Sequence, residues 1–202
     1  MATKILYLFA HPLFEKSRVN KTLMRNVRHF KNITFRDLYE EYPEFNIDVV
    51  LEKELLLQHD LIVWHHPFYW YSCPPLLKQW IDMVLEVGWA YGPGGTALRG
   101  KKLIQIITTG GPMSAYNEKG YNRFTIREFL APFEQTALLC NLEYTPPFVI
   151  HGTHRLSGEE IHQSAILFNR LLELLSNELF NPSNYQKLTY MNEACIAKTK
   201  LT

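Results

Sequence analysis

Five short apolar runs recur along the chain, separated by segments with helical periodicity. The runs cover residues 4–10, 33–37, 60–66, 102–108 and 146–151. Most are continuous stretches of apolar residues rather than alternations of apolar and polar ones. Continuous runs are typical of strands in a parallel sheet that is covered on both faces, so the pattern predicts five parallel strands.

Helical periodicity fills the segments between these runs. The clearest helix begins at Ser157, which can form a capping box with Glu160, and its apolar stripe continues to Leu179. Ser17 is placed to cap an earlier helix whose apolar stripe is Val19, Leu23, Val27 and Phe30. The other helices are expected over 48–58 beginning at Asp48, from Pro74-Pro75 to Leu85, and over 124–140 with an interruption at Pro132.

Strand and helix alternate five times, which predicts an α/β fold in three layers around a doubly wound parallel sheet. Five strands favour the flavodoxin-like order 2-1-3-4-5 over a six-stranded dinucleotide-binding fold. We expect one domain over residues 1–180. Residues 181–202 lose the periodicity and are expected to form an extended or flexible C-terminal tail.

Composition and charge narrow the function classes. The chain has 202 residues, 47% of them hydrophobic, which indicates a globular domain with a sizeable core. A formal net charge of +1 gives no electrostatic signature of nucleic-acid binding. No apolar run is long enough for a membrane span, and the N-terminus enters a strand without a signal-peptide pattern, so we expect a cytoplasmic protein.

The three cysteines are far apart in the sequence and lack metal-ligand spacing. We therefore expect neither a disulfide framework nor a metal site. Cys73, next to an aromatic loop, is interpreted as a small buried side chain, with a reactive thiol as the alternative.

The first strand is followed by a loop rich in hydrogen-bond donors. His11, Ser17 and Asn20 precede or open a helix, where a phosphate can bind. Neither GxGxxG nor GxxxxGK[ST] is present, which argues against a P-loop and weakens a dinucleotide site. In the alternative interpretation, Ser17 only caps its helix and His11 only closes a turn.

Two further loops follow later strands. Residues 68–71 are four consecutive aromatics, which suit a flat ligand or an exposed oligomerisation patch, while His65 and His66 are expected to be core histidines. Gly110-Gly111 allows a close backbone approach or a positive φ, and Tyr116 can donate a hydrogen bond, although an ordinary turn remains the alternative. Because the carboxyl ends of parallel strands meet at one edge, the loops predict one pocket for a phosphorylated, flat aromatic cofactor.

Several longer motifs occur in a fixed order, namely YPEFNID at 42–48, the segment 61–101, TTGG at 108–111 and PPF at 146–148. With them, the chain resembles the flavin-dependent NAD(P)H:quinone oxidoreductases of flavodoxin-like fold, closest to the bacterial ancillary flavoproteins of glutathione-regulated potassium-efflux systems. The resemblance implies bound FMN, with FAD as the alternative, NADPH or NADH as donor, and two-electron ping-pong transfer to a quinone. It also implies a homodimer that completes the site across its interface.

The resemblance also implies roles for individual residues. The flavin phosphate would be held by His11, Ser17, Arg18, Val19 and Asn20, and the isoalloxazine by Pro67, Phe68, Tyr69, Trp70 and Tyr71. The pyrimidine edge would be lined by Thr108, Thr109, Gly110 and Gly111. Tyr116 falls on the family's catalytic tyrosine, which also contacts the flavin. Six residues later, where the best-known members have a histidine, this chain has Asn122, which can donate a hydrogen bond but cannot carry a proton charge.

Two other function classes stay open. One is a regulatory flavoprotein subunit of a membrane potassium-efflux antiporter, peripheral on the inner face of the cell membrane; the resemblance motivates it, but no residue pattern specifies the partner surface. The other is an electron-transfer flavodoxin, which the near-neutral charge disfavours because an acidic docking face would be expected.

Overall fold

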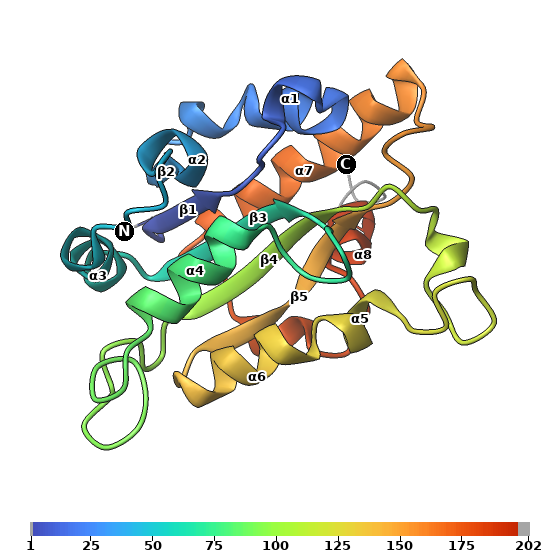
Figure 1. The fold of residues 1–202 in the computed structure, drawn as a ribbon. Coiled ribbons are helices and arrows are strands. Elements are labelled where there is room, and N and C mark those ends of the chain that lie inside the picture. Colours follow the sequence, from blue (N-terminus) through green and yellow to red (C-terminus); the bar gives the residue numbers. More distant parts are fainter. Residues whose placement is uncertain (1, 198–202) are drawn as a thin grey trace.

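Five parallel strands form the centre of the molecule, in the order β2-β1-β3-β4-β5 (Figure 1). The computed structural model describes residues 2–197. The strands are β1 (Ile5–Phe9), β2 (Ile33–Asp37), β3 (Leu61–Pro67), β4 (Lys102–Thr108) and β5 (Glu143–Ile150). The expected fold class and strand order are therefore confirmed.

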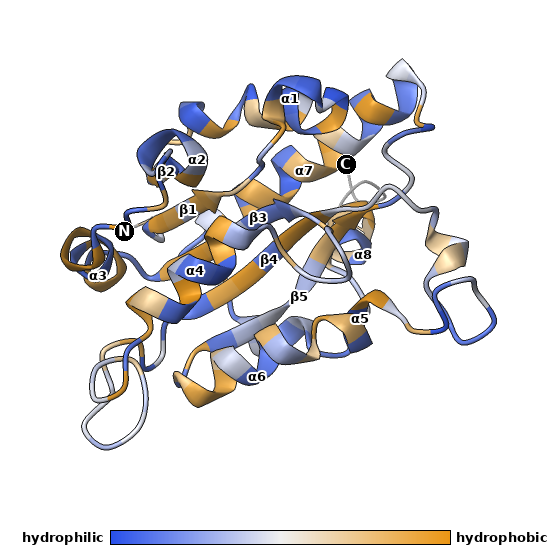
Figure 2. Cartoon of the chain, viewed as in Figure 1, coloured by the Kyte–Doolittle hydropathy of each residue, from blue (hydrophilic) through white to orange (hydrophobic). Residues whose placement is uncertain are grey.

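The three inner strands are the most hydrophobic elements of the sheet. Every residue of β1 and β3 is buried, and Figure 2 shows hydrophobic colour along β1 and β4. The edge strand β5 starts three residues earlier than expected and contains Pro146 and Pro147. An edge strand tolerates prolines because only one side of it needs backbone N–H donors, and the register between β4 and β5 is irregular near Gln105.

Helices cover both faces of the sheet (Figure 1). One face packs against α1 (Arg18–Met24) and α7 (Gly158–Ser176), with a core that includes Phe9, Val63 and Phe168. The opposite face packs against the remaining central helices, which are α2 (Leu38–Glu41), α3 (Val49–Gln58), α4 (Pro75–Val84), α5 (Ile126–Phe129) and α6 (Ala131–Leu139). The three predicted layers are present.

Three helix caps read from the sequence are confirmed. The Ser17 side chain accepts a hydrogen bond from the Asn20 backbone N–H, and Asp48 accepts one from Leu51. Ser157 forms the full capping box with Glu160 at the start of α7. These caps satisfy backbone donors that would otherwise lack a partner in the first helical turn.

Three helix ends differ from the expectation. The predicted helix over 124–140 is split at Leu130 into α5 and α6, which places Pro132 in the first turn of α6, where its missing N–H is not needed. The first stripe does not form one helix, because α1 ends at Met24 and a separate 3-10 turn spans Val27–His29. Helix α7 ends at Ser176, and Leu179 is 82% exposed.

The C-terminal segment is packed against the sheet edge, so the expectation of an extended or flexible tail is wrong for residues 181–197. It contains a 3-10 turn (Pro182–Tyr185) and helix α8 (Met191–Ala197), which contacts both α7 and β5. The Asn192 side chain donates to the Val149 carbonyl and accepts from the Val149 N–H, both at 2.9 Å. This amide pairs with the open edge of β5 as a neighbouring strand would. Residues 198–202 of the predicted tail lie outside the described residues.

No helix between residues 2 and 197 has both the length and the apolar character that crossing a bilayer requires.

Candidate functional site

A cavity of about 270 Å³ lies where the carboxyl ends of the inner strands meet the start of α1. Its lining contains most of the residues expected to bind a cofactor, namely His11, Ser17, Arg18, Val19, Asn20, Pro67, Phe68, Tyr69, Thr108 and Gly110. Leu13, Lys16, Thr153 and His154 line it as well. The fold thus brings three separate loops together, as the strand-end argument predicts.

Asn20 is held in this cavity by a buried chain of hydrogen bonds. Its Nδ2 donates to Ser17 Oγ at 3.0 Å and to Thr108 Oγ1 at 3.2 Å, while its Oδ1 lies 2.9 Å from His65 Nε2. Because that oxygen only accepts, His65 donates from Nε2, and its Nδ1 accepts from the Tyr7 hydroxyl at 2.6 Å. Burial keeps the pKa of His65 well below its ordinary value, so the ring is neutral. His65 is a core histidine, as expected, but it also orients a cavity residue.

His11 presents a hydrogen-bond donor to the same cavity. Its Nδ1 accepts from the Leu13 backbone N–H at 3.2 Å, and burial lowers its pKa to about 4. The ring is therefore neutral at pH 7 and carries its hydrogen on Nε2. Lys16 and Arg18 add two cations, and no carboxylate lines this cavity within the described part of the chain. This set of donors fits an anion such as a phosphate group.

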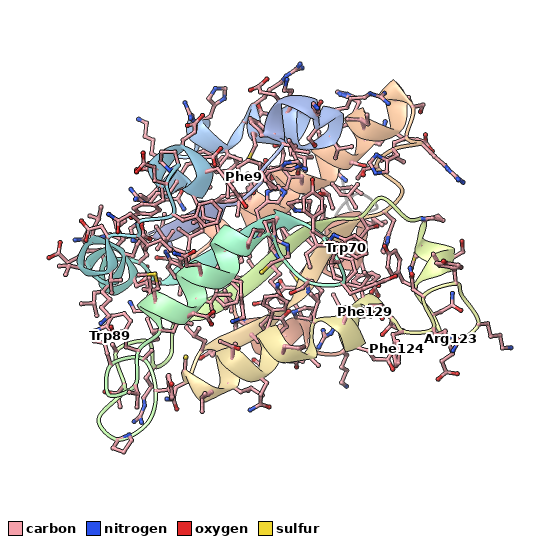
Figure 3. All side chains as sticks on the ribbon, viewed as in Figure 1. Phe9, Trp70, Trp89, Arg123, Phe124 and Phe129 are labelled. Carbon is pink, nitrogen blue, oxygen red and sulfur yellow. The ribbon has the colours of Figure 1, made fainter. Side chains whose placement is uncertain are left out.

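The aromatic loop after β3 is a tight turn with an unusual backbone. The Ser72 N–H donates to the Tyr69 carbonyl at 2.9 Å, and Trp70 and Tyr71 between them have φ of 49° and 63°. Bulky residues rarely adopt positive φ, so this turn is strained. Trp70 is 93% exposed, and Figure 3 shows it in the same part of the view as Phe124 and Phe129. The ring of Tyr71 stacks on Phe129 with centroids 4.9 Å apart.

A second cavity, of about 530 Å³, adjoins the first and shares Phe68 with it. Both residues expected to be catalytic, Tyr116 and Asn122, line it, together with Trp70, Tyr71, Gly111, Pro112, Ala115, Tyr121 and Arg155. The Tyr71 hydroxyl donates to Asn122 Oδ1 at 3.3 Å, so the aromatic turn contacts the Asn122 side chain. Burial raises the pKa of Tyr116, so its hydroxyl is protonated at neutral pH and can donate.

The glycine pair after β4 makes close contacts rather than an unusual turn. Neither Gly110 nor Gly111 has a positive φ, so that alternative is wrong. A Cβ on Gly110 would lie 2.8 Å from the His154 ring, and one on Gly111 would lie 3.1 Å from the Tyr116 hydroxyl. The glycines are therefore needed because two side chains of the site approach the backbone closely.

Thr109 is the one residue of the predicted set that faces neither cavity. It is fully buried, and its hydroxyl donates to the Gly111 carbonyl at 2.8 Å and lies 3.2 Å from His151 Nδ1. Its backbone carbonyl accepts from both the N–H and the hydroxyl of Thr153. Thr109 therefore links the loop after β4 to the loop after β5 through hydrogen bonds and does not contact a ligand site itself.

The loop after β5 also belongs to the site, and the sequence analysis missed it. Thr153 and His154 line the first cavity, and Arg155 lines the second. The signal was present in the chain, since the same strand-end rule applied to the run ending at 151 points to the residues that follow it.

Cys73 is buried beside the aromatic turn. Burial raises its pKa to about 11, because a thiolate is poorly solvated there. The interpretation as a buried side chain is confirmed, and all three cysteines are free thiols.

The family model described as a flavodoxin-like fold matches residues 3–170, and the chain belongs to this family. It is 43% identical over 170 residues to the glutathione-regulated potassium-efflux system ancillary protein KefG of Erwinia tasmaniensis, covering 84% of this chain and 92% of that protein.

Two solved structures are similar over nearly their whole length. General stress protein 14 of Treponema denticola in complex with FMN is 42% identical, with a TM-score of 0.81 and coverage of 85% of this chain and 99% of that one. The NADPH-quinone reductase of P. pentosaceus is 30% identical, with a TM-score of 0.77 and coverage of 87% and 99%. The resemblance read from the motifs is confirmed.

Proposed function

We propose that this protein is a flavin-dependent NAD(P)H:quinone oxidoreductase that uses FMN. The observation that carries the proposal is the adjacency of two unlike cavities. One offers donors and cations to a phosphate, and the other offers aromatic walls and two hydroxyl or amide groups to a flat ring. Phe68 lies between them, so one ligand with a charged tail and a planar head can occupy both.

The phosphate end would be held by the donors of the first cavity, which are His11, Ser17, Arg18 and Asn20. Ser17 can serve both as a helix cap and as a ligand, because a hydroxyl oxygen has two lone pairs and one hydrogen. We favour FMN over FAD, since no segment of the sequence suggests an adenine site. The structural relative crystallised with FMN supports this choice.

The ring would lie against Pro67–Tyr71 and the 108–111 loop, with Tyr116 at one edge. When bound, FMN would supply the redox chemistry, which is hydride acceptance from NADPH or NADH and two-electron transfer to a quinone in separate half-reactions with ping-pong kinetics. The chain orients the reactants and stabilises charge. The Tyr116 hydroxyl is the donor placed to stabilise negative charge on a ligand in the second cavity.

Asn122 would act as a neutral donor in the same cavity. It cannot exchange a proton at neutral pH, so the protons consumed in turnover would come from solvent or from another group. The exposed Trp70 is suited to contact a second copy of the chain, which supports the proposal of a homodimer with a shared site. We place the protein in the cytoplasm.

The proposal is tested by anaerobic titration of FMN-loaded protein with NADPH and then NADH, followed by menadione, while the flavin absorbance is recorded. We expect bleaching by a nicotinamide and recovery on quinone. Tyr116→Phe should retain FMN but bleach more slowly, because the activation free energy of flavin reduction should rise by at most about 2–4 kcal/mol. Tyr185→Phe, in the C-terminal segment, is the matched control. A flavin that binds but never bleaches contradicts the proposal.

A second candidate is a regulatory flavoprotein subunit of a potassium-efflux antiporter, located at the inner face of the membrane. The 43% identity to an ancillary protein of such a system favours it. Co-purification of the tagged protein with the antiporter from detergent-solubilised membranes tests this candidate, and the absence of retention under conditions that retain KefG rejects it.

A further inference from the structure

His151 lies directly after β5 and lines neither of the two cavities. Its Nδ1 lies 3.2 Å from Thr109 Oγ1. Its ring lies between those of Tyr116 and Tyr190, each with a centroid 5.7 Å away. Its Nε2 is buried and has no hydrogen-bond partner. A buried polar atom without a partner is costly, so the position is expected to have a function that requires it.

The hydrogen bonds fix which nitrogen of His151 carries the hydrogen. Thr109 has one hydroxyl hydrogen, and it is donated to the Gly111 carbonyl at 2.8 Å, an atom that can only accept. Thr109 Oγ1 must therefore accept from His151, which requires a hydrogen on Nδ1. Burial lowers the pKa of His151 to about 4, so the ring is neutral at pH 7 and Nε2 has only a lone pair.

Thr109 connects this imidazole to the catalytic tyrosine. Thr109 Oγ1 and the Gly111 backbone both lie near the Tyr116 hydroxyl. The Tyr116 hydroxyl also lies where a Cβ on Gly111 would be 3.1 Å away. A change in the orientation of Thr109 would therefore move both neighbours of that hydroxyl.

We propose that His151 is a positioning residue for Tyr116, and that it acts by donating Nδ1–H to Thr109, which holds the Thr109 hydroxyl on the Gly111 carbonyl. The unpartnered Nε2 follows from this role, because only the Nδ1 side of the ring is used. Tyr190, from the C-terminal segment, also packs against the ring. The catalytic part of this inference rests on the proposed function.

The role can be separated from simple packing by two amide substitutions. The amide nitrogen of Asn occupies the place of Nδ1 in histidine, whereas that of Gln lies one bond further, near the place of Nε2. His151→Asn should therefore keep the donor to Thr109, and His151→Gln should lose it. If His151 only filled space, Asn would not be expected to replace it better than Gln, which is closer to histidine in size.

The first measurement is made on the full chain without added ligand. Long-range ¹H–¹⁵N correlation spectra, assigned with His151→Asn, report the tautomer, and the ring signals of Tyr116 report its surroundings. We expect hydrogen on Nδ1 in the wild type, Tyr116 signals displaced in His151→Gln, and much smaller displacement in His151→Asn. Hydrogen on Nε2, or Tyr116 signals that are equal in both variants, would overturn the proposal.

The second measurement is the rate of flavin bleaching by the preferred nicotinamide. His151→Gln should slow it about tenfold with little change in the KM for the nicotinamide, while His151→Asn should stay within about threefold of the wild type. His162→Gln, at an exposed position of α7, is the control. Equal rates for the Asn and Gln variants reject the role of His151. Failure of the wild type to bleach rejects the proposed function instead, and the spectra then still test the hydrogen bonds.

Discussion

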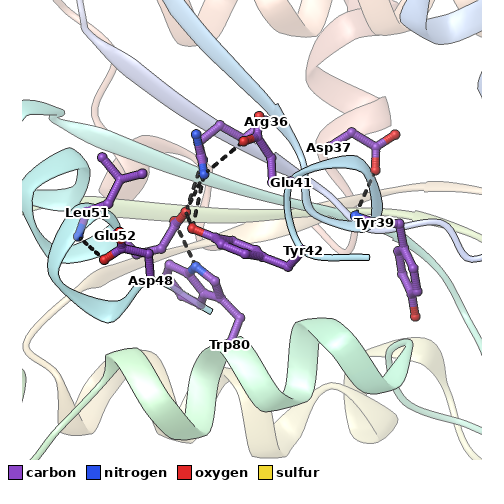
Figure 4. A network of polar contacts seen from close by, with 9 residues as sticks. All are labelled: Arg36, Asp37, Tyr39, Glu41, Tyr42, Asp48, Leu51, Glu52 and Trp80. Carbon is purple, nitrogen blue, oxygen red and sulfur yellow. Dashed lines mark hydrogen bonds and ion pairs between the residues drawn. The ribbon is translucent and has the colours of Figure 1, made fainter. Parts of the chain in front are cut away.

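Two polar regions of this molecule differ in how completely their buried groups are hydrogen-bonded. At one, Glu52 of α3 is completely buried in a cluster that links β2, α2, α3 and α4 (Figure 4). At the other, the cavities at the carboxyl edge of the sheet present donors such as His11 and Lys16 with few acceptors among them. In the first region the hydrogen bonds are made within the chain, whereas the second region has donors that a ligand can use.

The Glu52 cluster satisfies both oxygens of its carboxylate. Oε1 accepts from Arg36 Nε at 3.0 Å and from the Tyr42 hydroxyl at 2.7 Å, while Oε2 accepts from Trp80 Nε1 at 2.8 Å. Arg36 also lies 3.4 Å from Glu41. A buried charge is tolerated here because a cation and two neutral donors surround it. Such a network connects elements of the fold, and both oxygens of the Glu52 carboxylate are already used within it.

The carboxyl edge differs because its histidines are neutral and partly unpaired. His65 is paired on both sides, but His151 leaves Nε2 without a partner, and His11 directs a donor into the cavity. The difference teaches that polar burial alone does not mark a functional site in this protein. What marks the carboxyl edge is that its hydrogen-bond donors line a cavity.

The largest expected effect that separates the two regions is acid sensitivity. Burial lowers the pKa of His11, His66 and His151 from an ordinary value of 6.5 to about 4, and it also keeps the pKa of His65 well below its ordinary value. The unfolded chain therefore takes up protons first, so this contribution to stability is complete above pH 6.5 and is lost as the pH falls towards 4. At pH 5 the loss is about 2 kcal/mol per histidine.

Urea unfolding at pH 7.5 and pH 5, combined with hydrogen exchange, tests this expectation. Amides in the loops after β3 and β4 should lose protection before those of α3 and α4. His162→Gln, at an exposed histidine, should leave the pH profile unchanged. Equal stability at the two pH values, or earlier opening around Glu52, would break the comparison.

The second largest effect is expected at Glu52. Glu52→Leu leaves the Arg36 guanidinium and the Trp80 N–H without their buried acceptor, so unfolding free energy should fall by about 3–5 kcal/mol. Urea unfolding measures it, with Glu54→Leu as the control because Glu54 is exposed on the same helix. A loss no greater than that of the control would show that the cluster does not depend on its carboxylate.

The third prediction concerns ligand binding at the other region. Asn20→Ala removes one donor of the first cavity and leaves His65 Nε2 without its acceptor. FMN affinity should fall by about 1.5–3 kcal/mol, the range for hydrogen bonds to charged groups. Fluorescence titration with FMN measures it against Asn26→Ala, which lies just after α1 and makes no side-chain cap. Equal affinity of the two variants would remove Asn20 from the phosphate site.

The smallest effect is expected at the edge of the sheet. Asn192→Ala removes both hydrogen bonds to Val149, so unfolding free energy should fall by about 1–2 kcal/mol. Thermal and urea unfolding measure the loss, with the exposed Asn184→Ala as control. If Asn192→Ala unfolds as the control does, the C-terminal segment does not stabilise β5 through this amide.

Several features could be predicted because they depend on neighbours in the sequence. The strand runs, the caps at Ser17, Asp48 and Ser157, and the placement of three loops at strand ends all follow from local pattern and the geometry of parallel sheets. The fold class and ten lining residues of the first cavity were accessible in this way. The helix split at Leu130 was foreseen only as an interruption at Pro132.

Other features depend on residues far apart in the chain, and no local signal marks them. Glu52 lies in helix α3, and its buried carboxylate is paired by Arg36, Tyr42 and Trp80, which come from three other parts of the chain. The positive φ of Trp70 is not visible in its residue type, since bulky residues disfavour it.

The sequence by itself determined the positions of the strands along the chain, the helix caps and the residues that lie at the carboxyl edge. The reason is that hydrophobic periodicity and capping act over a few residues. Only the tertiary structure decided which polar groups found partners. It paired Glu52 completely, placed His151 beneath Thr109 and Tyr116, and brought Asn192 to the edge of β5. The reason is that a buried polar group is stabilised or left unpaired by atoms across the fold, and those contacts exist only once the chain has packed.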